Sequence, residues 1–213
     1  MKVAIFQFAL FGINTYIVHD PATRECAIID PGMTSPEERR AIDGFIEREG
    51  LHVQHLINTH MHIDHVIGDK YVSSKYGVGV EAHPADEILG ERVEQQAQMF
   101  GLGIDVDGVP TERYISDGDV VKIGSGELIA LHIPGHSPGS IVLYDKADGF
   151  VIAGDVLFQG SIGRTDLPGG SMTELLTGIR QKLLPLPDDT IVYPGHGPVT
   201  TIGDERRHSP YLK

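Results

Sequence analysis

Cysteine is nearly absent from this sequence: Cys26 is the only one among 213 residues. A single thiol excludes an internal disulfide and a cysteine-rich zinc site. It also favours a reducing compartment, which predicts a cytoplasmic protein. Cys26 leads into the apolar run Ala27-Ile28-Ile29. A cysteine in such a run usually behaves as a small buried hydrophobic side chain, so we predict a structural thiol and not a nucleophile.

Positive charge is also scarce. The chain has 17 lysine and arginine residues against 30 aspartate and glutamate residues, which gives a formal net charge of −13. Because nucleic acids bind to basic surfaces, this balance argues against a nucleic-acid partner and favours a small-molecule one. Residues 1–18 have a single basic residue and lack the cleavage site of an export signal, and no apolar run has transmembrane length. No membrane partner is therefore expected, and no pattern specifies an oligomeric state.

The spacing of apolar residues predicts strands and helices along the whole chain. Helices are expected at 36–49, 66–75, 85–99 and 173–183, and a glycine- and aspartate-rich loop at 101–113. Strands are expected at 3–8, 14–19, 27–29, 53–58, 119–123, 128–133, 140–145, 150–153 and 190–193. This order predicts an α/β fold in which two sheets pack together with helices on their outer faces, and a single domain over residues 1–213.

Histidine and aspartate residues gather where predicted strands end. Alternate residues of an extended segment project to one side, so two histidines separated by one residue can reach one metal ion, and the residues after the turn can serve a second. Imidazole together with carboxylate suits zinc, iron or manganese better than calcium. The candidate ligands are His60, His62, Asp64 and His65 in one short segment, and His136, Asp155 and His196 after later strands or turns.

The segment Thr59-His60-Met61-His62-Ile63-Asp64-His65 resembles the Thr-His-x-His-x-Asp-His signature of the metallo-β-lactamase superfamily. The later ligands follow in the order that this family shows. The resemblance implies a four-layer αββα sandwich with the site at one edge of the two sheets. It implies two divalent metal ions, of which zinc is expected and iron or manganese are alternatives. The implied ligands are His60, His62 and His136 for the first ion, Asp64, His65 and His196 for the second, and Asp155 as the bridge.

The segment from Gly160 to Ser171 resembles the short bacterial branch of glyoxalase II, the hydroxyacylglutathione hydrolases. Longer members carry a C-terminal helical domain that supplies part of the glutathione site, and we expect none here. Arg164 stands where the resemblance implies a basic substrate-binding residue, since a guanidinium binds a carboxylate through two N–H groups. A structural pair between Arg164 and Asp166 is an equally weighted alternative.

The resemblance implies hydrolysis of a small thioester, foremost S-D-lactoylglutathione, by a hydroxide that bridges two metals. Asp64 would orient the hydroxide, and Asp155 would fix the separation of the metals. The first alternative is a persulfide dioxygenase with one iron held by His60, His136 and Asp155, because such relatives also keep a Gly-Arg-Thr-Asp segment. Lactonases, other hydrolases of the superfamily and a non-catalytic metal-binding scaffold are further alternatives, although a complete ligand set argues against the scaffold.

Overall fold

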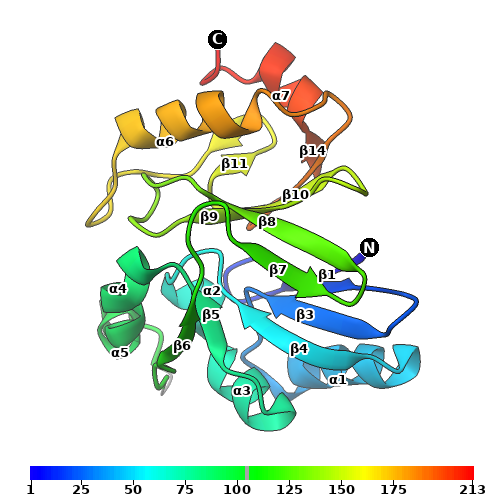
Figure 1. Cartoon of the computed structure of the whole chain (residues 1–213). Coiled ribbons are helices and arrows are strands. Elements are labelled where there is room, and N and C mark those ends of the chain that lie inside the picture. The colour runs from blue at the N-terminus through cyan, green and yellow to red at the C-terminus, as the bar shows by residue number, and fades with distance from the viewer. Residues whose placement is uncertain (104–105) are drawn as a thin grey trace.

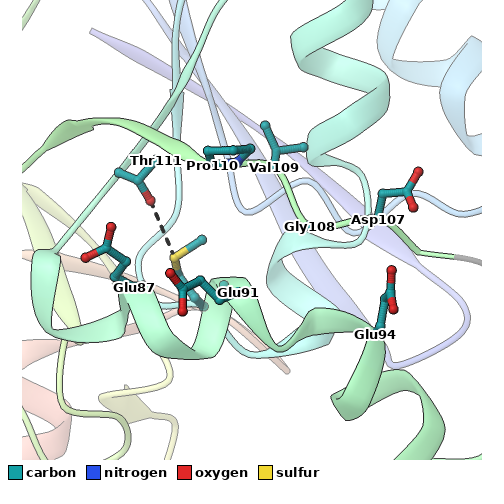
Figure 2. A pocket seen from close by; sticks show the side chains of 10 residues that line it. Glu87, Glu91, Glu94, Asp107, Gly108, Val109, Pro110 and Thr111 are labelled. Carbon is teal, nitrogen blue, oxygen red and sulfur yellow. Dashed lines mark hydrogen bonds between the residues drawn. The ribbon is translucent and has the colours of Figure 1, made fainter.

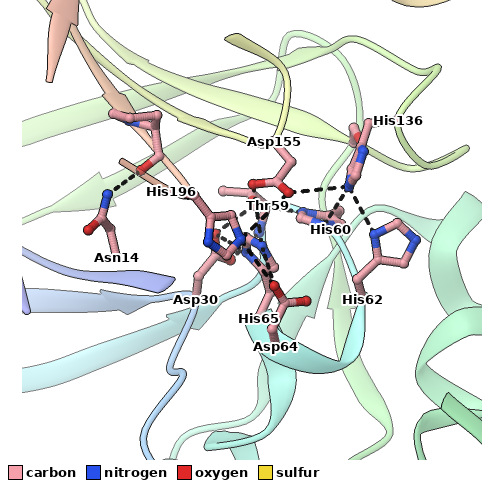
Figure 3. A network of polar contacts seen from close by, with 12 residues as sticks. Asn14, Asp30, Thr59, His60, His62, Asp64, His65, His136, Asp155 and His196 are labelled. Atoms are coloured by element: carbon pink, nitrogen blue, oxygen red, sulfur yellow. Dashed lines mark hydrogen bonds and ion pairs between the residues drawn. The ribbon is translucent and has the colours of Figure 1, made fainter. Parts of the chain in front are cut away.

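A computed structural model describes residues 1–103 and 106–213, which contain two six-stranded sheets packed face to face (Figure 1). Helices lie on the outer face of each sheet, so the layers follow the order α, β, β, α. The αββα fold class predicted from the sequence is therefore confirmed. The candidate metal ligands lie at one edge of this pair of packed sheets (Figure 3).

The first sheet has its strands in sequence order. Its first three strands are antiparallel, and the remaining pairs are parallel. The parallel strands all end at the same edge of the sheet, which brings the segments after β3 and β4 together. The strands are β1 (Lys2–Phe8), β2 (Ile13–His19), β3 (Glu25–Ile29), β4 (His52–Ile57), β5 (Val80–Ala82) and β6 (Thr111–Tyr114).

The second sheet has the order β14-β13-β10-β9-β8-β7. Its only parallel pair among the described residues joins β10 to β13, so these two strands also end at one edge. A separate hairpin of β11 (Leu157–Phe158) and β12 (Ser161–Ile162) follows β10. The strands are β7 (Val120–Ile123), β8 (Gly126–His132), β9 (Ile141–Asp145), β10 (Phe150–Gly154), β13 (Ile191–Pro194) and β14 (Thr200–Thr201).

Strands in the middle of each sheet are buried on both faces. In β2, Tyr16 and Val18 point toward the second sheet, and Ile17 between them points toward the helices of the first. This alternation follows from the two-residue period of a strand, and it explains why these strands are apolar throughout. Cys26 belongs to the helix-facing core and is fully buried, and burial raises the pKa of its thiol to about 12. The predicted burial of this thiol is confirmed.

The helices are α1 (Pro36–Glu49), α2 (Ile63–Val66), α3 (Asp69–Tyr76), η1 (Pro84–Asp86), α4 (Glu87–Glu91), α5 (Val93–Met99), α6 (Met172–Gly178), η2 (Ile179–Leu183) and α7 (Ile202–His208). Helix α1 begins as expected, with Pro36 in its first turn and a capping box in which Ser35 and Glu38 bond each other's backbone. It ends at Gly50, which adopts a left-handed conformation with φ 62°.

Three predicted helices are interrupted in the structure. The helix expected at 66–75 is divided into α2 and α3 around Gly68, whose N–H donates to the carbonyl of Pro31 at 2.7 Å. A Cβ at Gly68 would lie 2.5 Å from the carbonyl oxygen of Pro31, so only glycine permits this close approach of the two backbones. The helix expected at 85–99 is divided into η1, α4 and α5, with a break at Arg92, and the helix expected at 173–183 becomes the π-helix η2 after α6.

The loop predicted at 101–113 is wrong at its end, because Thr111–Tyr114 forms β6 and pairs with β5. Residues 104–105 of that predicted loop lie outside the described residues. The short strands β5, β11, β12 and β14 and the helix α7 were not predicted. Strands of two or three residues are too short to show a periodic pattern. No helix in the described part of the chain is long and apolar enough to cross a lipid bilayer.

Candidate metal centre

The seven predicted ligands come from both sheets and meet at one edge (Figure 3). His60 and His62 follow the end of β4, and Asp64 and His65 lie in α2. In the second sheet, the ligands come after β8, β10 and β13. These are His136, Asp155 and His196. Because each segment is anchored by a buried strand, the side chains are held by the packing of both sheets.

The first group consists of His60, His62 and His136, whose ligand atoms all lie within 4.8 Å of one another. Nε2 of His136 is 2.9 Å from Nδ1 of His62 and 3.2 Å from Nε2 of His60. The other nitrogen of His136, Nδ1, lies 2.8 Å from the backbone carbonyl of Arg164. A carbonyl only accepts, so Nδ1 carries the proton and Nε2 presents a lone pair. Three ring nitrogens that converge in this way fit a shared cation.

The second group consists of Asp64, His65 and His196. Oδ2 of Asp64 is 3.0 Å from Nε2 of His196 and 3.7 Å from Nε2 of His65. The loop that carries His196 is held by Asn14, whose amide donates to the carbonyl oxygens of Pro194 and Gly197 at 3.0 and 2.9 Å. The structure therefore brings together the three side chains that the sequence assigned to a second metal.

Asp155 lies between the two groups. Its Oδ2 is 3.5 Å from Nε2 of His136 and 3.7 Å from Nε2 of His196, and its Oδ1 is 3.5 Å from Nε2 of His65. Asp155 Oδ1 and His65 Nε2 are both buried, and neither has a hydrogen-bond partner among the described residues. A buried polar atom without a partner is costly, so these two atoms fit a site that a metal ion completes.

Two histidines of the first group, His60 and His62, have the protonation state that a metal ligand needs. Burial, reinforced by the neighbouring histidines, holds the pKa of His60 well below its ordinary value and lowers the pKa of His62 to about 4. Both rings are therefore neutral near pH 7 and offer a lone pair.

In the second group the pKa of the buried histidine His65 is raised instead of lowered. Burial alone would lower the pKa of His65, but the carboxylates of Asp64, Asp30 and Asp155 outweigh it and hold this pKa well above its ordinary value. Burial likewise opposes the ionisation of Asp64 and Asp155, and attraction to His65 lowers the pKa of both carboxyls. Ionised carboxylates around one buried point stabilise positive charge there, whether it is a proton or a metal ion.

Asp30 orients the second group, a role that was not predicted from the sequence. It is fully buried after β3, with φ 51°. Its carboxylate accepts hydrogen bonds from the N–H and the hydroxyl of Thr59 at 2.7 and 2.6 Å, and its Oδ2 is 2.9 Å from Nδ1 of His65. Nδ1 of His65 therefore carries a proton toward Asp30, and Nε2 faces Asp155, which is the carboxylate–histidine arrangement common at metal sites.

Asp86 is the second carboxylate that sequence reasoning missed. It ends η1, is fully buried, and accepts hydrogen bonds from Met61 N–H at 3.0 Å, Ser137 Oγ at 2.7 Å and Gly139 N–H at 2.5 Å. Met61 lies between the first two ligand histidines, and Ser137 follows His136. Asp86 thus joins the two segments that form the first group. Burial raises its pKa, but the three donors favour the carboxylate.

The backbone beside Asp155 leaves no room for a side chain at Gly195. A Cβ there would lie 2.2 Å from Asp155 Oδ1 and 2.8 Å from His65 Cε1. The glycine before His196 is therefore required by a close approach to two candidate ligands, Asp155 and His65.

A cavity of about 230 Å³ opens in front of the two groups. Arg164 lines it, and its guanidinium donates from Nε and Nη2 to Asp166 at 2.7 and 2.8 Å. The pair predicted as the structural alternative for Arg164 is thus present.

A second hollow, of about 400 Å³, lies beside α4 and β6 (Figure 2). The side chain of Met61 reaches it and contacts Thr111, whose hydroxyl lies 3.9 Å from Met61 Sδ. Four carboxylates line it, from Glu87, Glu91, Glu94 and Asp107, and none of them belongs to the two ligand groups. This hollow is therefore distinct from the histidine cluster.

Known proteins resemble the chain over nearly its full length. The family model described as "Metallo-beta-lactamase superfamily" matches residues 9–196. The hydroxyacylglutathione hydrolase GloC of Haemophilus influenzae is 39% identical over 214 residues, which cover 100% of this chain and 98% of that protein.

Two solved structures share the fold closely. The BLEG-1 B3 metallo-beta-lactamase has a TM-score of 0.87 and 32% sequence identity, with 100% of both chains covered. TTHA1623, in a di-iron-bound form, also has a TM-score of 0.87, with 34% identity over 99% of this chain and 100% of that one. From the family match, the sequence identity and the ligand geometry, we conclude that the chain belongs to the metallo-β-lactamase superfamily of metallo-hydrolases.

Proposed function

We propose that the protein hydrolyses small thioesters with two divalent metal ions, and that S-D-lactoylglutathione is the first substrate to test. The observation that carries this proposal is the convergence of three histidine nitrogens in the first group, beside two buried atoms without hydrogen-bond partners, Nε2 of His65 and Oδ1 of Asp155. The thioester follows from the similarity to the hydroxyacylglutathione hydrolase GloC.

The residues of the first group, His60, His62 and His136, would hold one ion, and those of the second group would hold the other, with Asp155 shared between them. Zinc suits such a mixture of imidazole and carboxylate, and iron or manganese fit the same donors. Since both sheets supply ligands, we also propose that residues 1–213 act as one domain.

Metal ions bound here would supply hydroxide near neutral pH and polarise the carbonyl of the thioester. The residues of the chain would orient the attacking water and the ligand rings. Asp64 and Asp155 are held ionised, so each can accept a hydrogen bond from an attacking water and orient its lone pair toward the carbonyl carbon. Asp30 and the backbone carbonyl of Arg164 hold the rings of His65 and His136 in one tautomer.

The role of Arg164 in substrate binding stays a proposal of its own. The guanidinium lines the cavity, so a substrate carboxylate could compete for it. Such a contact would have to displace or share Asp166, which already takes two of its N–H groups.

The test is a metal titration of stripped protein, with thioester hydrolysis followed at each point. Activity should rise until about two ions are bound per chain, and Asp155→Ala should lose both binding and turnover while keeping the fold. Asp145→Ala is a matched control, because Asp145 is also buried but lies at the far end of β9 and should bind metal normally. Turnover by metal-free protein would refute the proposal. Oxygen uptake with glutathione persulfide at about one iron per chain would favour the dioxygenase instead.

A further inference from the structure

The cavity in front of the metal ligands has a second wall that the ligands do not form. Apart from the ligand residues and Arg164, its lining is apolar and comes from four separate segments. These residues are Phe11, Ile63, Phe100 and Leu167. A substrate that reaches the ligands must therefore lie against this apolar wall.

Phe11 is held close to the candidate ligand His196. It lies in the turn between β1 and β2, two residues before Ile13, which forms a β-bridge with His196. The next residue, Asn14, donates its backbone N–H to the carbonyl of Gly195 at 2.8 Å. The turn that carries Phe11 is thus joined by its backbone to the segment of the second group.

Phe100 is likewise held close to candidate ligands, here those of the first group. It caps the end of α5, and Gln96, one turn earlier, bonds the segment of the first group. The Gln96 amide accepts from Ile63 N–H at 3.0 Å and donates to the carbonyl of Met61 at 3.1 Å. Phe100 remains 48% exposed, so a bound ligand can still bury much of its ring.

Apart from the proposed metal ions, the cavity offers few basic side chains that could bind the two carboxylates of a thiol carrier such as glutathione. Among the described residues that line the cavity, Arg164 is the one lysine or arginine, and it already donates two hydrogen bonds to Asp166. The net charge of −13 also gives no long-range attraction for an anion.

We propose that this cavity recognises thioesters by the apolar part next to the reacting carbonyl, through Phe11 and Phe100, and leaves the thiol carrier in solvent. The inference rests on the proposed function, because it concerns the substrate class of the same site. The reaction is hydrolysis: the oxygen of water bonds to the acyl carbon, the carbon–sulfur bond breaks, and the thiol leaves with a proton. The substrate class is then acyl thioesters with any small carrier, charged or neutral.

The experiment compares two thioesters with the same acyl group, S-D-lactoylglutathione and S-D-lactoyl-N-acetylcysteamine, on metal-loaded protein. The inference predicts that kcat/KM for the two differs by no more than about threefold. Phe11→Ala and Phe100→Ala should each lower kcat/KM by about tenfold for both thioesters, mainly through KM, because a shortened apolar contact weakens binding by that order. Their metal content should not change.

Two neighbouring residues serve as matched controls. Leu10 and Met99 are exposed apolar residues next to Phe11 and Phe100 in sequence, and neither lines the cavity. Leu10→Ala and Met99→Ala should leave kcat/KM unchanged for both thioesters. An equal loss in these controls would overturn the role of the two phenylalanines.

Carrier selectivity separates this inference from the proposed function. A preference of more than about threefold for the glutathione thioester would overturn the inference and leave the hydrolase intact, and its removal by Arg164→Ala would assign the carrier contact to Arg164. Hydrolysis of neither thioester by fully metal-loaded protein would refute the proposed function itself.

Discussion

Replacement of Asp86 is the most informative perturbation, because this carboxylate joins the segments of the first group without being one of its candidate ligands. In Asp86→Ala, the N–H groups of Met61 and Gly139 lose a buried acceptor, and the hydroxyl of Ser137 loses one of its two partners. The loops that carry His60, His62 and His136 then lose the hydrogen bonds that join them through Asp86.

The expected loss of unfolding free energy follows from the two backbone donors, the N–H groups of Met61 and Gly139. Each buried donor left without an acceptor costs about 1–3 kcal/mol, which gives roughly 2–6 kcal/mol for the pair. Burial raises the pKa of Asp86, so removing the charge recovers part of this cost. We therefore expect a loss of about 2–4 kcal/mol in the free energy of unfolding. Metal binding by the first group should weaken by about 10- to 100-fold, as for other residues that support metal ligands.

The assay measures metal affinity by competition with a chelator and unfolding by denaturant on the same preparations. Asp86→Asn keeps the shape but replaces one acceptor oxygen with a donor, so it should also weaken the metal. Asp145→Ala is the control, since Asp145 is a buried aspartate that accepts from the N–H groups of Ala147 and Asp148 in a turn away from the site. The reasoning is refuted if Asp86→Ala binds metal as tightly as the parent, or if Asp145→Ala loses metal to the same extent.

Three further predictions concern the same centre. Asp30→Asn removes the charge behind His65, so the affinity of the second group should fall by about 10- to 100-fold in chelator competition, and unchanged affinity would contradict the proposed support. Gly195→Ala places a Cβ against Asp155 and should lower kcat/KM by about 100-fold, whereas Gly44→Ala, with open space around it, should not; equal activity of the two would count against the account. Stripping the metal should lower the melting temperature, and zinc at about 100 times its dissociation constant should restore about 2.7 kcal/mol of stability; a melting temperature independent of metal would rule out linkage between metal binding and folding.

The cluster of candidate ligands could be predicted because the signals that mark its members are local. The His60-x-His62 spacing and the strand-then-turn contexts of His136, Asp155 and His196 lie within short segments. The layer order was also predictable, because central strands such as β2 are apolar along their whole length.

The supporting residues could not be predicted in the same way. Asp30 bonds a histidine 35 positions away, and Asp86 bonds Ser137 and Gly139 51 and 53 positions away. A hydrogen bond between distant segments leaves no periodic pattern in the sequence. The break at Gly68 has the same origin, since it depends on a contact with Pro31 that only the folded chain creates.

The most direct test of the central claim is hydrolysis of S-D-lactoylglutathione by purified protein, with metal content determined on the same sample. The account predicts turnover with close to two metal ions per chain, lost on chelation and recovered when zinc is returned. Absence of thioester hydrolysis in protein that carries about two ions per chain would contradict it.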